Sequence, residues 1–295
     1  MNKTEFVEAA KLLAANGKFY KDITWDRHRL SLLNHIISGD ELDAFLRWST
    51  LVATMVVGDV PYVYDNLADL AIDESGTDWL MAMIDNNLGQ PARLVKFPQY
   101  TGTFVNQAHN LMVWQNATGC SVKDIHRIVE FGGGFGAMCA LINRLGFVGE
   151  YHLFDYPEFL LLQRYYLEGT GLPATTLANI HYREVDGVGR FDLPPEDVDL
   201  LIGCHSLSEA PRELRNAFID MAYADSILIV SQDVWDDVDM GNEWRHFSSI
   251  RRNYNWQQID YYNIPGHFYL IGNLVVKYGE IGDRHEETIQ QDRTD

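Results

Sequence analysis

The sequence has few cysteines and no long apolar run. Its 3 cysteines, Cys120, Cys139 and Cys204, show no CxxC or zinc-type spacing among the 295 residues. Cys139 and Cys204 are therefore interpreted as core positions, and no disulfide framework is expected, which suits a reducing cytosol. No apolar stretch approaches the ~18 residues that cross a bilayer. The amphipathic, charged N-terminus is not typical of a signal peptide, so we expect a cytoplasmic protein.

Basic residues are also scarce. The chain carries 23 Lys and Arg against 42 Asp and Glu, which gives a formal net charge of −19. Nucleic-acid affinity depends largely on Lys and Arg that neutralise phosphates, and this chain has no surplus of them. DNA, RNA and anionic membranes are therefore not expected as partners. A small neutral or cationic molecule fits this charge better.

What the sequence does contain is enough apolar residues for a large core, in two differently patterned regions. Hydrophobic residues make up 46% of the chain, which is typical of a globular protein. Residues 1–120 have apolar residues at helical spacing, including a helix expected from an Asp40 N-cap through Leu42 towards Val57. Such a helical region serves as a lid, a substrate wall or a dimer surface, and a homodimer is possible. Within it, the predicted helix 104–114 carries Gln107, His109 and Asn110, which either line a pocket or form a solvated face.

Helices and strands alternate from Ser121 to about residue 279, before a polar tail at 280–295. Apolar runs predict strands at 128–131, 151–154, 180–185, 198–204 and 226–230, with a closing antiparallel pair at 257–262 and 268–278. Helices are expected at 137–145, 157–169, 211–221 and 243–253. This pattern predicts an α/β domain of Rossmann-like type with its ligand at the carboxyl ends of the strands.

The first strand of this domain leads into a glycine-rich loop. Gly132, Gly133, Gly134 and Gly136 separate the strand from the helix that begins at Ala137, and the second strand ends on Asp155. Glycines let the backbone turn sharply and let a ligand approach the helix N-terminus. An acid at the end of the second strand is placed to accept hydrogen bonds from ribose hydroxyls.

Two ligands fit this loop. Gly132-x-Gly134-x-x-Ala137 matches the dinucleotide fingerprint of a nicotinamide or flavin enzyme. Glu130-x-Gly132-x-Gly134-x-Gly136 resembles motif I of class I S-adenosylmethionine-dependent methyltransferases. Glu130 discriminates between them, because a carboxylate repels a pyrophosphate but suits the ammonium and sulfonium cations of S-adenosylmethionine. A purely structural glycine turn is the third alternative, which the entropic cost of four glycines disfavours.

Further segments are similar to small-molecule O-methyltransferases. Phe154-Asp155-Tyr156-Pro157 resembles the acid-x-proline segment of the plant-type enzymes, and VEFGGGFG, FDYPE and HSLSE resemble bacterial sugar O-methyltransferases. The likeness covers about residues 121–278 and implies a mostly parallel seven-stranded sheet with an antiparallel last strand. It also implies cofactor-binding roles for Glu130, Gly132, Gly133, Gly134, Gly136, Asp155, Tyr156, Asp186 and His205, with Asp155 at the ribose and Asp186 near the adenine. The plant enzymes place an acid and a tryptophan where this chain has Ser206 and Leu207.

Two histidines are candidate catalytic bases. In the plant-type enzymes that this chain resembles, a histidine at the position of His205 deprotonates the acceptor hydroxyl. Histidine suits this task because its pKa lies near neutral pH. His267 is the rival candidate, in the loop between the last two strands. Glu209 either orients His205 or is simply an acid in the first turn of a helix.

A metal-assisted reaction is a weaker alternative. Asp233, Asp236, Asp237 and Asp239 follow the fifth strand, where Mg²⁺ would find oxygen ligands, although a solvated acidic loop explains them better. Trp235 and Trp244 in the same stretch are candidates for an apolar wall over the acceptor. We therefore expect S-adenosylmethionine as cofactor without a required metal. The expected reaction is O-methylation of a small polar molecule such as a sugar, with an NAD-dependent oxidoreductase and a non-catalytic scaffold as alternatives.

Overall fold

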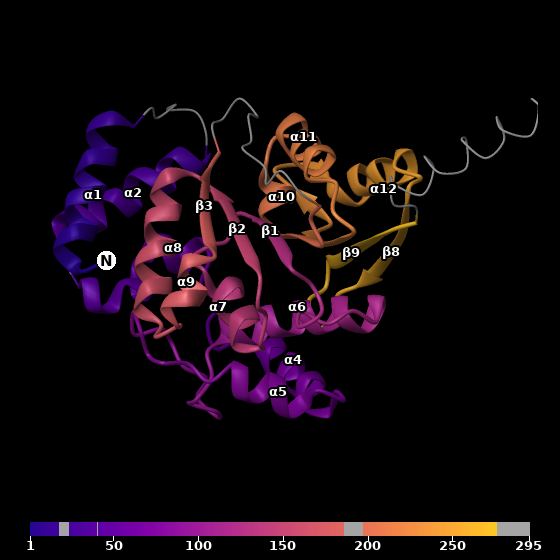
Figure 1. The fold of residues 1–295 in the computed structure, drawn as a ribbon, viewed down its shortest axis with the longest axis horizontal. Coiled ribbons are helices and arrows are strands. Elements are labelled where there is room, and N and C mark those ends of the chain that lie inside the picture. Colours follow the sequence, from indigo (N-terminus) through magenta and orange to yellow (C-terminus); the bar gives the residue numbers. More distant parts are fainter. Residues whose placement is uncertain (18–23, 40, 186–196, 276–295) are drawn as a thin grey trace, which may run out of the picture.

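A computed structural model describes residues 1–17, 24–39, 41–185 and 197–275, and a seven-stranded sheet forms its centre (Figure 1). The strand order is β3-β2-β1-β4-β5-β9-β8. The strands are β1 (Arg127–Phe131), β2 (Glu150–Asp155), β3 (Ile180–Glu184), β4 (Leu200–Cys204), β5 (Ser226–Gln232), β8 (Tyr254–Asp260) and β9 (His267–Leu274). Neighbours from β3 to β5 pair in parallel, whereas β9 is antiparallel to both β5 and β8. The predicted Rossmann-like architecture, a mostly parallel seven-stranded sheet with an antiparallel last strand, is confirmed.

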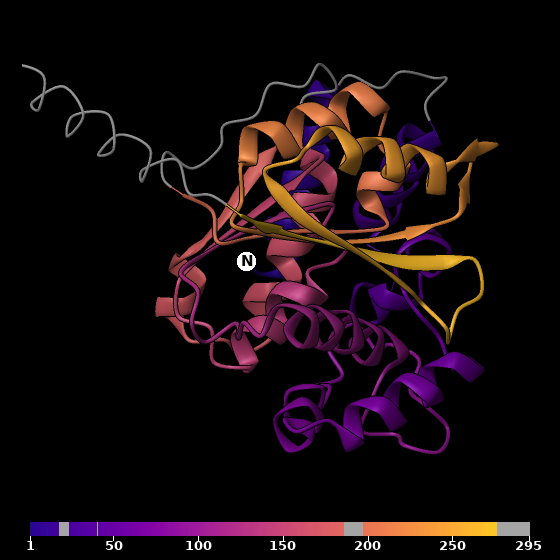
Figure 2. The same ribbon diagram turned by 90° about the vertical axis from the view of Figure 1, so that its right-hand side faces the viewer.

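Side chains alternate between the two faces of this sheet, as strand geometry requires. On β1, Ile128 belongs to one buried cluster and Val129 to the other. Helices α6 (Gly102–Thr118), α7 (Ala137–Arg144) and α8 (Pro157–Gly169) cover the Ile128 face. Helices α11 (Arg212–Ala222) and α12 (Met240–Ile250) cover the Val129 face, as Figure 2 shows. The sheet is thus covered on both sides, which explains why its central strands β4 and β5 are mostly apolar.

Shorter elements fill the connections of the domain. They are α9 (Ala174–Ala178), α10 (Ser206–Glu209), and the strands β6 (Val234–Trp235) and β7 (Val238–Asp239). β6 and β7 form a hairpin whose two turn residues, Asp236 and Asp237, both have positive φ. Hairpin turns of this kind favour Asp, Asn and Gly, because these residues tolerate the left-handed conformation. No pattern of residues predicts this hairpin, since each strand is only two residues long.

The N-terminal part is helical, as expected, with one correction. Its helices are α1 (Lys3–Asn16), α2 (Thr24–Ser38), η1 (Leu42–Arg47), α3 (Ser49–Thr54), α4 (Pro61–Ile72) and α5 (Gly76–Ala82). The single helix expected from residue 40 towards Val57 is wrong, because η1 is a 3₁₀ helix and the chain bends at Trp48 before α3. Trp48 is buried, so its packing overrides the local helical pattern. The predicted cap Asp40 and the predicted cofactor residue Asp186 lie outside the described residues, as does the tail 280–295.

Helix α6 connects the two regions. Its Trp114 is buried against the sheet and donates a hydrogen bond from Nε1 to Ser226 Oγ on β5, at 2.8 Å. The predicted helix 104–114 is confirmed, although it begins at Gly102 and ends at Thr118, before Gly119 in the left-handed conformation. No helix among the described residues is both long enough and apolar enough to cross a bilayer.

A buried ion-pair triad fixes α2 to α8. Arg29 donates from Nε and Nη2 to the two carboxylate oxygens of Glu158, at 2.7 and 3.2 Å. Its Nη1 donates to Asp26 Oδ1 at 2.7 Å, and all three side chains are at most 8% exposed. The guanidinium also lies over the ring of Tyr156, 4.5 Å from its centroid. Because Tyr156 follows the acid of β2, this triad links the N-terminal helices to the end of that strand.

Replacing Arg29 by methionine should destabilise the protein strongly. The variant would retain two buried carboxylates without their shared guanidinium, and breaking a buried ion pair in this way costs about 3–5 kcal/mol. The free energy of unfolding in urea measures this loss. Arg27→Met is the matched control, since Arg27 is exposed on the same helix and should change stability by less than about 0.5 kcal/mol. Equal effects of the two substitutions would contradict the role of the triad.

Candidate functional site

One large cavity lies at the carboxyl ends of β1, β2, β4 and β5. Its volume is about 1200 Å³. The reversal of strand order between β1 and β4 places it at the position where open parallel sheets bind ligands. Most of the predicted site residues line this cavity together, namely Glu130, Gly132, Gly133, Gly134, Asp155, Tyr156, His205 and His267. Residues that are far apart in the sequence therefore converge here.

Three glycines of the loop, Gly132, Gly133 and Gly134, line the cavity together with Phe135. Gly132 and Gly134 have φ of +70° and +58°, in the left-handed region. A Cβ on Gly132 would lie 2.3 Å from Ser206 Cβ. The backbone of the loop therefore packs directly against the Ser206 side chain in the turn after β4. Gly136 does not line the cavity. Its φ is +98°, and a Cβ there would lie 3.1 Å from Leu167 on α8, so it serves helix packing instead.

The loop also presents hydrogen-bond donors to the cavity. Gly132 donates its N–H to Phe154 O at 2.8 Å, and Gly136 donates to Gly133 O at 2.8 Å. Between them, the N–H groups of Gly133, Gly134 and Phe135 have no protein acceptor within the described part of the chain. Unpaired backbone donors just before a helix attract an acceptor, particularly an anionic one. A ligand carboxylate or hydroxyl is the chemistry they would accept.

Glu130 is a buried carboxylate directly beneath this loop. It is 4% exposed, and its Oε2 accepts a hydrogen bond from the Tyr151 hydroxyl at 2.8 Å. Burial raises the pKa of Glu130 to about 7, and the Tyr151 hydrogen bond opposes this rise. No cation of the described chain pairs with this carboxylate. A cationic ligand group would therefore stabilise its charged form.

Asp155 lies at the end of β2, beside the loop. Its Oδ1 accepts from the Tyr156 N–H and its Oδ2 from Gln163 Nε2, both at 2.8 Å. Gln163 also donates to Gly134 O at 3.1 Å, so one amide joins the acid to the glycine loop. Burial raises the pKa of Asp155 to about 7, despite these two hydrogen bonds. Each carboxylate oxygen keeps a lone pair that ligand hydroxyls can use.

The N-terminal helices cover this end of the cavity. Trp25 on α2 and residues 52–57, at the end of α3 and beyond it, line the wall that faces the glycine loop. The Cβ of Met55 lies 3.5 Å from where a Gly134 Cβ would be. Tyr156 adds an aromatic side that Arg29 holds in place. The helical region therefore contributes a roof to the site, and a bound ligand would lie between it and the loop.

The two candidate bases line the cavity and lie next to each other. The rings of His205 and His267 are 5.5 Å apart, with 75° between their planes. His205 has φ of +64°, which a non-glycine residue adopts at a cost, and its N–H donates to Val230 O at 2.8 Å. Burial, together with the neighbouring His267, lowers the pKa of His205 to about 4. The His205 ring is therefore neutral at neutral pH and can accept a proton.

Gln232 at the end of β5 orients His205. Its Oε1 lies 3.2 Å from His205 Nδ1. With the amide oxygen facing the ring, Nδ1 carries the proton and Nε2 keeps the lone pair of a base. Glu209 lines the cavity as well, but no hydrogen bond joins it to the His205 ring among the described residues. Burial raises the pKa of Glu209 to about 7.

The acidic cluster after β5 consists largely of turn and cap residues. Asp236 and Asp237 form the hairpin turn, and Asp239 accepts from Asn242 N at 2.9 Å as the N-cap of α12. Asp236 lines the cavity, whereas Asp233 does not. Within the described chain these aspartates do not bring three donor atoms together. Trp235 lines the cavity as expected, but Trp244 is buried and donates to Ser231 Oγ at 3.0 Å.

Several lining residues had no motif in the sequence. Arg212 and Arg215 on α11 both pair with Glu243 Oε2 on α12, at 3.2 and 3.1 Å. Asn106 and Gln107 line the cavity from α6. Of the two alternatives for the polar face of that helix, Gln107 therefore follows the first, a residue that lines a pocket. His109 instead is buried, with Nδ1 2.9 Å from the Tyr269 hydroxyl. The amide-rich composition of α6 indicated that this helix could line a pocket, whereas no pattern in the sequence indicated Arg212 or Arg215.

Comparisons with known proteins add fold-level likeness only. No family model and no curated protein matches the chain. Among solved structures, the methyltransferase domain of bacterial CtHen1 is 12% identical with a TM-score of 0.44, covering 57% of this chain and 97% of that one. A SAM-dependent methyltransferase from Aquifex aeolicus is 12% identical (TM-score 0.42, 72% and 98%), and the glycopeptide N-methyltransferase MtfA complexed with S-adenosyl-L-methionine is 10% identical (0.43, 57% and 87%). At such identities neither their reactions nor their ligands carry over to this chain.

The burial of Glu130 predicts a pH dependence of stability. Its pKa is about 7 in the folded protein against 4.5 without burial, so the folded state holds an extra proton between these values. Its stabilising contribution is complete below pH 4.5 and is lost as the pH rises through 7, an effect of up to about 3 kcal/mol. In Glu130→Gln, the free energy of unfolding in urea should therefore fall less between pH 4.5 and 7 than in the wild type. The exposed Glu74→Gln is the control, and an identical pH slope in wild type and Glu130→Gln would contradict the assignment.

Proposed function

We propose that this protein transfers a methyl group from S-adenosylmethionine to a hydroxyl of a small polar molecule. The observation that carries the proposal is the content of one cavity. The glycine loop with its unpaired N–H groups, the buried Glu130 and the half-buried Asp155 line one part of it, and the neutral His205 lines the same cavity next to Ser206. The first group forms a cofactor end, and His205 is a base that would act on a molecule bound in the remaining acceptor end.

The residues at the cofactor end match the polar groups of S-adenosylmethionine. Asp155 is placed to accept hydrogen bonds from both ribose hydroxyls, because Tyr156 and Gln163 fix its orientation. The N–H groups of Gly133 and Gly134 suit the methionine carboxylate. Glu130 suits the cationic part of the molecule, since a positive charge nearby offsets the burial of its carboxylate.

The same residues disfavour a dinucleotide. A pyrophosphate on this loop would lie close to Glu130, whose Oε2 is only 3.3 Å from where a Gly133 Cβ would be. Like charges at such a distance repel, and the two carboxylates would have to remain protonated. Binding of NAD or a flavin at this loop is therefore the less favourable alternative.

S-adenosylmethionine supplies an electrophilic methyl group, and its transfer requires an aligned and deprotonated oxygen. His205 would take the hydroxyl proton on Nε2 while the oxygen–carbon bond forms and the sulfur–carbon bond breaks. Gln232 holds Nδ1, so the proton-accepting nitrogen points away from β5. Alignment between the roof and the loop supplies much of the acceleration, and the base supplies about 10²–10⁴-fold more. His267, 5.5 Å from the His205 ring, is placed to receive the proton afterwards.

The acceptor end of the cavity fits a hydroxylated molecule such as a sugar. Gln107, Glu209 and Asp236 offer hydrogen-bonding groups there, and Trp235 offers a flat apolar surface. Polar groups that surround an aromatic ring suit a compound with many hydroxyls. The net charge of −19 makes a nucleic-acid acceptor unfavourable. We further propose a cytoplasmic location, no required metal and a homodimer that forms through the N-terminal helices.

Calorimetry with S-adenosylmethionine tests the cofactor assignment. Asp155→Ala should weaken binding by about 10- to 100-fold, because hydrogen bonds to a charged group contribute about 1.5–3 kcal/mol. Asp260→Asn, an exposed acid on β8, should leave the affinity unchanged. Wild-type affinity in Asp155→Ala would refute the ribose assignment, and a wild-type protein that binds NADH but not S-adenosylmethionine would refute the proposed function.

The base can be tested by the release of S-adenosylhomocysteine with a panel of hydroxylated acceptors. His205→Ala should lower kcat by about 10²–10⁴-fold while cofactor affinity stays near wild type. Because the pKa of His205 is about 4, turnover at saturating substrates should fall only as the pH drops towards that value. His267→Ala should reduce turnover less. Full turnover in His205→Ala would exclude it as the base.

A further inference from the structure

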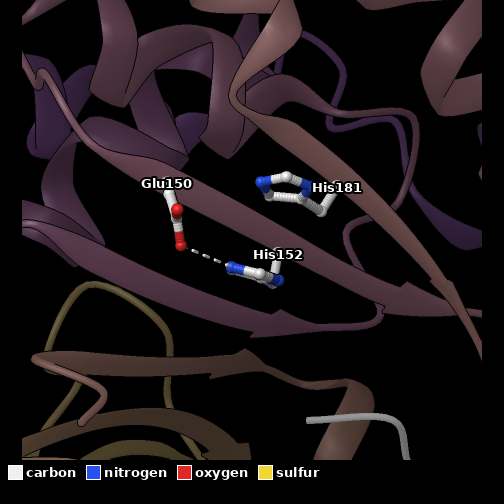
Figure 3. Close-up of side chains that lie close together, drawn as sticks. All are labelled: Glu150, His152 and His181. Atoms are coloured by element: carbon white, nitrogen blue, oxygen red, sulfur yellow. Dashed lines mark hydrogen bonds and ion pairs between the residues drawn. The ribbon is translucent and has the colours of Figure 1, made fainter. Parts of the chain in front are cut away.

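Three side chains outside the cavity bring donor atoms together at the opposite end of β2. Glu150 and His152 lie two residues apart on one face of β2, and His181 on β3 is the register partner of His152 (Figure 3). Their ligand atoms all lie within 4.8 Å of one another. Within the described ranges, these are the three His, Cys, Asp or Glu side chains that lie close enough together to hold one metal ion. The pleat keeps all three on the same side of the sheet.

The spacing of these atoms suits a metal better than a hydrogen bond. Glu150 Oε2 lies 3.4 Å from His152 Nε2, which is long for a hydrogen bond. Two ligands that each lie about 2.0–2.2 Å from a tetrahedral ion are themselves about 3.4 Å apart. The rings of His152 and His181 are stacked, with centroids 4.5 Å apart and 23° between their planes. A small rotation of the half-buried His181 would bring its nitrogen towards the same point.

The histidines are available as ligands. Burial lowers the pKa of His152 to about 4, and His181 contributes to this, so the ring is neutral at neutral pH. His152 Nε2 points towards the Glu150 carboxylate in Figure 3, so in the metal-free chain this nitrogen carries the proton. An ion bound at Nε2 would take the place of this proton, and the proton of the neutral ring would then be on Nδ1, which has no hydrogen-bond partner among the described residues. Neutral imidazole is the form that binds metals.

The carboxylate of the set is charged and oriented. Arg127 contacts Glu150 Oε2 from Nε and Nη2, both at 3.0 Å, and lowers the pKa of Glu150. A carboxylate has about four acceptor positions, so it can keep Arg127 and bind an ion as well. Such a partner fixes the direction of a ligating carboxylate. Arg127 is held in turn by Asp197 O at 3.0 Å.

We propose that Glu150, His152 and His181 form a binding site for a divalent transition-metal ion such as Zn²⁺. Two imidazoles and one carboxylate suit Zn²⁺ and its neighbours, whereas Mg²⁺ and Ca²⁺ prefer all-oxygen sites. Glu150 and His181 are partly exposed, so water can complete the coordination. The ion would join the edge strand β3 to β2. Because these strands end at Glu184 and Asp155, it would stiffen one wall of the large cavity without touching the reacting groups.

The experiment titrates Zn²⁺ into the full chain, free of any histidine tag and stripped with a chelator, in competition with a chromogenic zinc indicator. We expect about one Zn²⁺ per chain and a rise in Tm that the chelator reverses. His181→Ala and Glu150→Gln should each weaken binding by at least about tenfold. His246→Ala, which removes an exposed histidine on α12, should bind like wild type. Circular dichroism of the metal-free variants confirms that they are folded.

Two results would overturn this site. One is a wild-type chain that binds no Zn²⁺ more tightly than weak surface association, and the other is unchanged binding in both His181→Ala and Glu150→Gln. If His181→Ala does not fold, Glu150→Gln decides, since it keeps the shape of the side chain. Co²⁺ provides a second readout, because a tetrahedral site with nitrogen ligands gives a visible absorption that surface-bound Co²⁺ lacks. All of these measurements are independent of methyl transfer.

Discussion

The withdrawal of two carboxylates from water beside a glycine-rich loop is the constraint on which the rest of the site depends. Glu130 is the penultimate residue of β1 and Asp155 the last residue of the adjacent β2, and burial raises the pKa of each to about 7. Such groups destabilise the ionised folded state unless something compensates, so their position has a cost without a ligand. The unpaired N–H groups of the glycine loop lie in the same place. Two carboxylates and several backbone N–H groups that a ligand could satisfy thus lie side by side in one cavity.

The N-terminal helices complete this arrangement because the chain ties them to the sheet with buried polar contacts. Arg29 joins α2 to Glu158 at the start of α8, and its guanidinium covers Tyr156. At the other side, Asn66 on α4 donates to the Tyr261 hydroxyl at 2.7 Å. Tyr261 in turn donates to Asn106, which lines the cavity. The roof is therefore held by specific, directional contacts, and its position relative to the glycine loop is defined.

Much of the fold and part of the site could be predicted from the pattern of neighbouring residues in the sequence. The parallel strands are buried on both faces and so appear as short apolar runs, which is why their positions were predicted within a few residues. The glycine loop and Asp155 were found because a backbone that approaches a ligand needs glycine at set spacings. The break at Trp48 and the hairpin around Asp236 and Asp237 were missed. In the first case packing overrides helix propensity, and in the second the strands are too short to show a period.

The sequence by itself determined the sheet domain, the loop and the acid that follows the second strand, because these depend on neighbouring residues and on period. Only the tertiary structure decided that His205 and His267 face each other, that Gln163 joins Asp155 to the loop, and that Arg212, Arg215 and Glu243 belong to the same cavity. It likewise brought His181 beside Glu150 and His152. Most of these contacts join elements that are far apart in the sequence, and strand order, register and helix packing, which no local pattern encodes, place them together.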